Sequence, residues 1–200
     1  MKSIIYKASY KSPEIDKSEV LRYARSGADK ESLALLDSCI SETQDLFSYN
    51  LCYGRFGTRV SEDEIDLGFT KVRSHSLATC LMGCHEIILF GATVGFGIDR
   101  LIHKYSITSP SRAIMLQALG SERVEALCDA FCRDVSLSEG EVGNVIRPRF
   151  SPGYGDLSIE LQREIFIALD LTKNLGINLG NNLFMTPTKS VTAIVGIKKG

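Results

Sequence analysis

Residues 147–156 contain residue types that suit a small anionic ligand. They include two arginines, two aromatic residues and a Gly-Tyr-Gly turn, with no acid before Asp156. Each guanidinium offers a fork of donors to a carboxylate or phosphate, and the glycines let a ligand approach the backbone. Phe150 or Tyr154 can lie against a flat heterocycle. We expect Asp156 to cap a helix, whose N-terminus would add unpaired N–H groups and a partial positive charge.

Two features of the chain also have purely structural interpretations. The arginines of residues 147–156 can simply be solvated or paired with surface acids. The glycines Gly91, Gly95 and Gly97 follow an apolar run, but their spacing is not G-x-G-x-x-G and no P-loop Lys-Ser/Thr pair follows. Close packing at a strand-to-helix turn explains these glycines.

Four of the six cysteines form two pairs, Cys80/Cys84 and Cys128/Cys132, inside apolar, helix-patterned sequence. Cys80, Cys84 and His85 would supply three metal ligands or a redox thiol, but the C-x-x-C turn typical of structural zinc is missing. A free cysteine in apolar sequence behaves as a small buried hydrophobic residue. We therefore expect buried, reduced thiols and keep a metal or redox site as the alternative.

The composition excludes several classes of protein. The 200 residues are 44% hydrophobic and 24% charged, which allows one domain with a core and excludes wholesale disorder. The formal net charge is -1 without long runs of like charge, so we expect no nucleic-acid partner. The N-terminus lacks the apolar segment of a signal peptide, and charges interrupt the apolar stretch at 77–102, so we expect no membrane span. With reduced thiols, this predicts a cytoplasmic protein.

Helices and strands alternate irregularly, without the rhythm of a doubly wound fold. This order predicts a single α+β domain over 1–200, with a central twisted antiparallel or mixed sheet flanked by helices. After Pro110 an apolar stripe at helical spacing runs from Val124 to Val135, and we expect Gly120 and Ser121 to split that helix. We expect strands at 4–8, 86–94, 177–185 and 189–197, helices at 18–26, 30–47, 76–84, 98–105, from 110, and from 156 to 174, and extended segments within 48–69.

Residues 127–131 read Leu-Cys-Asp-Ala-Phe, residues 149–154 read Arg-Phe-Ser-Pro-Gly-Tyr, and residues 185–191 read Met-Thr-Pro-Thr-Lys-Ser-Val. These three motifs resemble the activation (reactivation) domain of cobalamin-dependent methionine synthase. Residues 149–154 fit its R-x-x-x-G-Y signature. Residues 127–131 resemble its L-A-E-A-F helix, and residues 185–191 resemble its M-x-P-x-x-S-V approach to the final strand. The motifs occur in the family's order at compatible spacing, whereas residues 1–75 match in coarse pattern only, so 76–200 is the expected core.

The resemblance implies a site for S-adenosylmethionine (AdoMet). Arg149 would hold the AdoMet carboxylate, and Asp129 would supply the family's acidic partner, one methylene shorter than the usual glutamate. A second family acid falls near Gly143, with Glu141 nearby, and a late aromatic falls near Val195. The residues implied to bind AdoMet are Asp129, Arg149, Ser151, Pro152, Gly153 and Tyr154.

The resemblance also implies a role in cobalamin chemistry. In that family the domain helps return inactive cob(II)alamin to methylcobalamin by reductive methylation, with an electron from flavodoxin or a similar donor. The chain lacks the D-x-H-x-x-G motif for base-off cobalamin. We therefore expect a stand-alone domain that acts in trans on a corrinoid-dependent methionine synthase or methyltransferase. The alternative is a non-catalytic module, binding a small ligand or a protein, that retains the fold.

Overall fold

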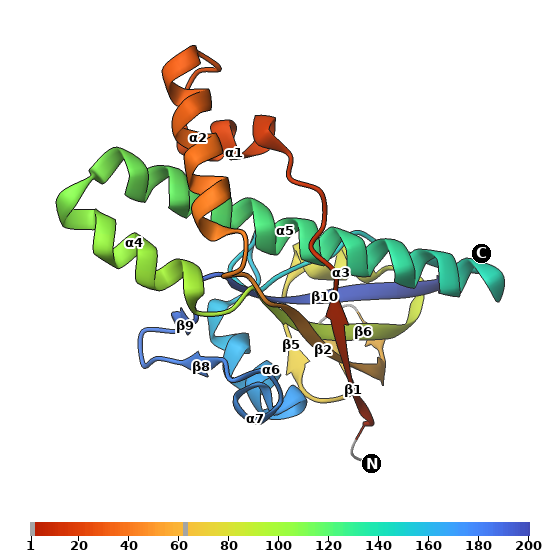
Figure 1. Ribbon diagram of the computed structural model, residues 1–200. Helices are drawn as coiled ribbons and strands as arrows, with labels where there is room; N and C mark the ends of the chain where they lie inside the picture. The colour runs from red at the N-terminus through yellow and green to blue at the C-terminus, as the bar shows by residue number, and fades with distance from the viewer. Residues whose placement is uncertain (1–2, 62–63) are drawn as a thin grey trace.

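The computed structural model describes residues 3–61 and 64–200, so residues 62 and 63 of the expected extended segment lie outside it. Its centre is a five-stranded sheet in which every neighbouring pair is antiparallel (Figure 1). This confirms the expected α+β class with a central antiparallel sheet. In spatial order the strands are β1 (Ile5–Tyr10), β2 (Tyr49–Gly57), β6 (Cys84–Thr93), β10 (Ser190–Lys199) and β7 (Asn144–Ile146).

Both faces of the sheet are covered, which explains why β6 reads as a continuous apolar run rather than an alternating one. Ile88 and Phe90 enter the cluster on one face, while Ile87 and Leu89 enter the cluster on the other. All four side chains are at most 2% exposed. The sheet therefore forms the middle layer of the domain.

One long helix, α5 (Pro110–Glu141), crosses the first face of the sheet (Figure 1). It contributes the stripe foreseen in the sequence, Val124, Leu127, Cys128, Phe131 and Val135, to the first apolar cluster. The other face is covered by α3 (His75–Leu81), a 3-10 turn (Ile159–Leu161), α6 (Gln162–Leu169) and α7 (Leu171–Leu175).

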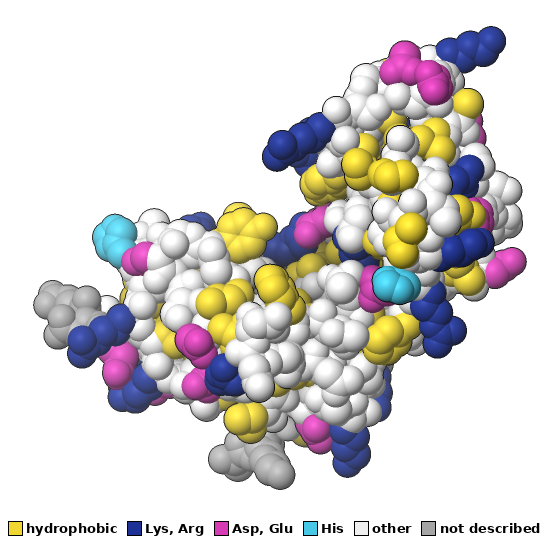
Figure 2. Space-filling model, turned by 90° about the vertical axis from the view of Figure 1, so that its left-hand side faces the viewer, with side chains coloured by type: hydrophobic (Ala, Val, Ile, Leu, Met, Phe, Trp, Pro, Cys, Tyr) yellow, Lys and Arg dark blue, Asp and Glu magenta, His cyan; other side chains and the backbone are white. Residues whose placement is uncertain are grey.

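A helical arm projects from the first half of α5. It consists of α1 (Lys17–Ala24), α2 (Lys30–Thr43) and α4 (Gly97–Thr108), which pack against α5 through a third apolar cluster (Figure 1). The surface is deeply notched between this arm and the rest of the molecule (Figure 2). Short strands complete the fold: β3 (Arg59–Val60), β4 (Ile65–Asp66) and β5 (Lys71–Val72) form one small sheet, and β8 (Asn178–Leu179) pairs with β9 (Met185–Thr186).

The expected break at Gly120 and Ser121 is wrong, because α5 continues through both residues. A Cβ at Gly120 would lie 3.0 Å from Cγ of Lys189 and 3.3 Å from Cγ1 of Ile98. The glycine therefore permits close packing of the helix against its neighbours. That packing outweighs the helix penalty of glycine, about 1 kcal/mol relative to alanine.

The helix expected from Asp156 is also wrong in its start. Oδ2 of Asp156 accepts the N–H of His75 at 2.7 Å, and its Oδ1 accepts the hydroxyl of Ser74 at 2.6 Å, so the carboxylate supports the N-terminus of α3. Ser158 caps the 3-10 turn that precedes α6 instead. Asp156 therefore does accept hydrogen bonds at a helix N-terminus, as expected, but the helix is α3, which lies about eighty residues earlier in the chain.

The strand expected at 177–185 exists only at its two ends, as β8 and β9. Between them the N–H of Leu183 donates to the carbonyl of Gly180 at 2.9 Å, and Leu183 has a φ of 64°. This turn folds the segment back on itself. None of the helices in the described ranges combines the length and the apolar character needed to cross a bilayer.

Candidate functional site

A cavity of about 490 Å³ lies where residues 149–154 approach the beginning of β10. In residues 3–61 and 64–200, β10 pairs on this side with β7 only at Ile197–Lys199 and with Phe150 at Ile194. The beginning of β10 is therefore an open strand edge beside the cavity. The cavity is lined by Glu125, Arg149, Phe150, Ser151, Pro152, Tyr154, Gln162, Met185, Ser190, Val191 and Thr192.

Backbone pairing fixes the loop to the sheet. The N–H of Phe150 donates to the carbonyl of Ile194, and the N–H of Ile194 donates back to Phe150, both at 2.8 Å. The N–H of Arg147 donates to the carbonyl of Gly196 at 2.8 Å. Since Arg147 and Phe150 are hydrogen-bonded to β10, the backbone of Arg149 between them is fixed relative to the sheet.

The glycines shape the turn that follows. Gly153 has a φ of 91°, and its N–H donates to the carbonyl of Leu157 at 2.9 Å. The N–H of Tyr154 donates to the carbonyl of Ser151 at 3.2 Å. Both N–H groups are thus paired within the turn, and these hydrogen bonds fix the path of the backbone beside the cavity. The Tyr154 side chain stays on the surface, with the residue 69% exposed.

The two arginines of the loop separate. Nε of Arg147 donates to the carbonyl of Cys80 at 2.9 Å, on the side of α3. Nη2 of Arg149 instead reaches α5, where it pairs with Oε2 of Glu125 at 2.5 Å and Oδ1 of Asp129 at 3.0 Å. Because one guanidinium faces two carboxylates, the group formed by Arg149, Glu125 and Asp129 carries an excess negative charge.

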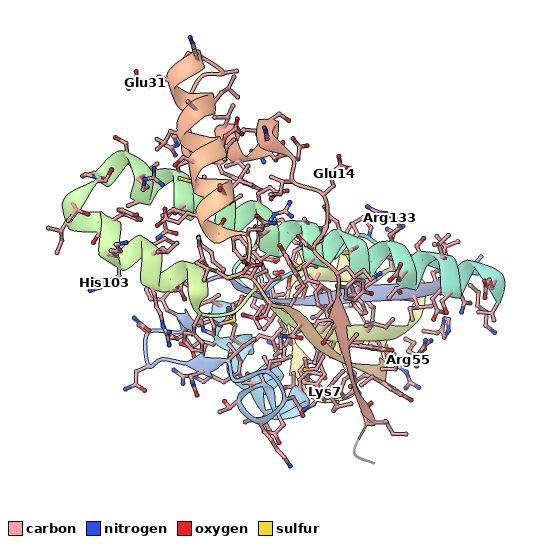
Figure 3. The ribbon with its side chains drawn as sticks, viewed as in Figure 1. Lys7, Glu14, Glu31, Arg55, His103 and Arg133 are labelled. Carbon is pink, nitrogen blue, oxygen red and sulfur yellow. The ribbon has the colours of Figure 1, made fainter. Side chains whose placement is uncertain are left out.

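Arg149 and Glu125 line two cavities at once. The second cavity, of about 530 Å³, lies along α5 and the segment before α1, and Asp129 lines this cavity rather than the first. Two of its residues, Glu14 and Arg133, are labelled in Figure 3 on the side of α5 away from the sheet. The ion pair of Arg149 with Glu125 therefore forms the boundary between the cavities.

The structure brings most of the site residues implied by the sequence to one cavity. Arg149, Ser151, Pro152 and Tyr154 line it directly, and Gly153 forms the turn that carries the last of them. Asp129 reaches it only through its contact with Arg149, and its side chain is 61% exposed.

The lining residues missed from the sequence are Glu125, Gln162 and the beginning of β10. Glu125 stands one helical turn before Asp129, so its i,i+4 spacing was a usable signal. Met185, Ser190 and Val191 belong to the M-x-P-x-x-S-V motif, which the sequence indicated only as the approach to the final strand. Nothing in the local sequence marked Gln162.

The cysteine alternative receives no support from the geometry. Within the described residues no group of three or more His, Cys, Asp and Glu side chains could hold a metal ion. Burial raises the pKa of the Cys80 and Cys84 thiols, and it raises the pKa of Cys132 to about 11. A raised pKa disfavours the thiolate, which is the nucleophile and the metal ligand.

A comparison with solved structures finds a protein domain with a similar fold. The crystal structure of the MetH reactivation domain bound to AdoHcy (S-adenosylhomocysteine) superposes with a TM-score of 0.65. The match covers 98% of this chain and 78% of that chain, at 13% sequence identity. This chain has the reactivation-domain fold. No family model matches the sequence. No curated protein matches it either.

The fold comparison confirms the resemblance drawn from the three motifs at the level of the fold. It also covers the N-terminal part of the chain, since 98% of the chain is included, although residues 1–75 match the family in coarse pattern only. The reactivation-domain fold here holds residues 149–154 against β10, beside the acids of α5.

Proposed function

We propose that this chain binds AdoMet or AdoHcy in the cavity lined by residues 149–154. The observation that carries the proposal is the position of Arg149, which lies at the cavity wall beside two carboxylates. AdoMet carries one carboxylate, one ammonium and one sulfonium. A guanidinium suits the first, and the carboxylate of Glu125, which lines the same cavity, suits a cationic group.

We further propose that the chain acts in trans on a separate corrinoid-dependent methionine synthase or methyltransferase. One electron from flavodoxin or a similar donor reduces cob(II)alamin on the partner to cob(I)alamin. The cobalt then takes the methyl group of AdoMet, the carbon–sulfur bond breaks, and AdoHcy remains. The role of this chain is to bind and orient the sulfonium ligand, which converts a bimolecular encounter into a positioned one.

Calorimetric titration with AdoMet and AdoHcy tests the binding step. Arg149→Ala should lower the affinity for both ligands by about tenfold to a hundredfold, because a charge-assisted, bidentate contact contributes about 1.5–3 kcal/mol. Arg147→Ala is the matched control, since this guanidinium lies against Cys80 and not in the cavity. No heat from the unaltered protein at millimolar ligand, or equal losses in both variants, would contradict the proposal.

A second titration identifies the acid that faces the ligand. Glu125→Gln should reduce the preference for AdoMet over AdoHcy, because the ligands differ by the positive charge of the sulfonium. At about 7 Å and an effective dielectric constant of 20–40, this charge interaction amounts to roughly 1–2 kcal/mol, or about a tenfold change in the ratio. Asp129→Asn should change the ratio less, because Asp129 lines the neighbouring cavity. A larger effect of Asp129→Asn would assign the role to Asp129.

Two observations favour the alternative of a non-catalytic ligand-binding module. The family's late aromatic falls near Val195, which is fully buried in the apolar cluster under α5. Glu141, near the expected position of the second acid, is not among the residues that line the cavity. Mixing the chain with a cob(II)alamin-loaded corrinoid protein, reduced flavodoxin and AdoMet distinguishes the two functions. If methylcobalamin forms faster than in a mixture that lacks the chain, the result supports reactivation. If the ligand binds but methylcobalamin does not form, the result supports the non-catalytic module.

A further inference from the structure

Two buried oxygens without a hydrogen-bond partner share this cavity. Across residues 3–61 and 64–200, the buried side-chain oxygens and nitrogens without a protein partner are Oε1 of Gln162 and Oγ1 of Thr192. Both residues line the cavity, and they are 6% and 2% exposed. An unsatisfied buried polar group costs about 1–3 kcal/mol, so nearly all such groups in proteins are paired. Their common location points to a ligand group that pairs with both.

These oxygens lie at a different end of the cavity from Arg149. Thr192 stands opposite Gly91 in the register of β10 and β6, and a Cβ at Gly91 would lie 2.5 Å from Leu171 of α7. Because directly opposed residues share a face of a sheet, the Thr192 side chain points toward α6 and α7. Arg149 instead pairs with Glu125 of α5, on the opposite face.

The cavity thus joins a charged end to a neutral polar end around the open edge of β10. The nearby hydroxyl of Ser190 is already committed, since it donates to the carbonyl of Pro187 at 2.8 Å and contacts Oγ1 of Thr93 at 2.9 Å. Gln162 and Thr192 are the lining side chains of the neutral end whose buried oxygens, among the described residues, have no protein partner.

The chemistry of the pair selects the ligand group. A carboxamide oxygen only accepts, whereas a threonine hydroxyl both donates and accepts. A phosphate or carboxylate offers acceptors alone and would leave Oε1 of Gln162 unsatisfied. The edge of a 6-aminopurine presents an N–H donor beside a ring-nitrogen acceptor, which complements the two oxygens together.

We propose that Gln162 and Thr192 bind the adenine base, with Oε1 of Gln162 accepting from the 6-amino group and the Thr192 hydroxyl donating to a ring nitrogen. This inference rests on the proposed function and deepens it. It assigns the charged end of the cavity to the amino-acid part of the ligand and the neutral end to the nucleobase.

The test uses nucleosides that lack the amino-acid part. Calorimetry compares adenosine with purine riboside, which lacks only the 6-amino group. The unaltered protein should bind adenosine about fivefold to tenfold more tightly, as expected for one buried hydrogen bond. In Gln162→Met, which keeps the length of the side chain, this ratio should fall to about one.

Thr192→Val, which keeps the shape of the side chain, should weaken both nucleosides about equally, because both carry the ring nitrogens. Gln117→Met is the matched control, since Gln117 is exposed on α5 and should leave the ratio unchanged. Thermal unfolding of each variant establishes that the fold is retained.

The outcomes separate this inference from the proposed function. If AdoHcy binds in an Arg149-dependent manner but the adenosine ratio survives Gln162→Met, the base assignment is wrong and AdoMet binding stands. If adenosine binds with a Gln162-dependent ratio but AdoMet and AdoHcy do not bind, the base assignment stands and the proposed function fails. If neither nucleoside binds at millimolar concentration, the base assignment is overturned.

Discussion

Replacing Arg123 by methionine tests how the N-terminal segment is attached to α5. Arg123 is fully buried, with Nη1 donating to the carbonyl of Pro13 at 2.6 Å and Nη2 to that of Glu14 at 2.7 Å. Its guanidinium also pairs with Glu122, which is 4% exposed and accepts the N–H of Asp16 at 3.1 Å. Methionine fills a similar volume but leaves the carboxylate of Glu122 buried without its cation.

Breaking a buried ion pair in this way costs about 3–5 kcal/mol. With a urea m-value of about 2 kcal/mol/M, the unfolding midpoint should fall by roughly 1.5–2.5 M. Part of that loss belongs to the uncompensated charge, so Glu122→Gln combined with Arg123→Met should be more stable than Arg123→Met alone.

Urea unfolding followed by circular dichroism provides the measurement. Arg133→Met is the control, because Arg133 is exposed ten residues along the same helix (Figure 3). The reasoning would be refuted if Arg123→Met shifted the midpoint no more than this control. It would also be refuted if the double variant were less stable than Arg123→Met, since the buried charge would then not be the cause of the loss.

Three further predictions concern stability. Gly140→Ala should stabilise the protein by about 0.5–1 kcal/mol, because a Cβ there meets nothing within 4 Å and alanine favours the helix. Gly153→Ala should destabilise the protein, because the φ of 91° disfavours a side chain and a Cβ would lie 3.2 Å from Ile159. The midpoint of urea unfolding should therefore rise in Gly140→Ala and fall in Gly153→Ala. Hydrogen bonds from Ser74 and from the N–H groups of α3 hold the pKa of Asp156 well below its ordinary value of 3.8. A carboxylate whose pKa is lowered in the folded state stabilises the protein at pH values above its unfolded-state pKa, and this stabilisation is lost as the pH falls through its folded-state pKa. The difference in unfolding free energy between the unaltered protein and Asp156→Asn should therefore be full at pH 7 and shrink below about pH 4. A difference that grew on acidification would contradict the capping role.

Short-range patterns allowed much of the fold to be foreseen from the sequence. The stripe from Val124 to Val135 follows the helical period, and its burial under the sheet needs only one partner surface. The apolar run of β6 identified a strand covered on both faces. These features depend on residues close together in the chain, which is where sequence patterns are most informative.

The features that were missed depend on distant contacts. Gly120 is a helix breaker by propensity, yet its close approach to Lys189 and Ile98 keeps α5 continuous. Asp156 has the chemistry of a cap, but its partners precede it by about eighty residues. No local pattern tells which helix such a carboxylate supports.

The candidate site shows the same division. The R-x-x-x-G-Y motif is contiguous in the sequence, and the structure places most of its residues at the wall of one cavity. The resemblance implied Asp129 and missed Glu125, although the two acids share one face of α5 and both contact Arg149. Which of them lines the first cavity depends on the path of the loop along β10, a contact between segments far apart in sequence.

The location of the cavity follows from a requirement of the sheet itself. An edge strand with free N–H and C=O groups invites pairing with other chains unless something covers it. Here β7 and Phe150 cover β10 from Ile194 onward. The remaining edge is covered not by a strand but by residues 151–154 and Gln162 across a cavity. The same arrangement places the charged groups of α5 on one face of the sheet and the neutral oxygens beside α6 on the other. The proposed ligand has a zwitterionic end and a neutral aromatic end, which match these two groups.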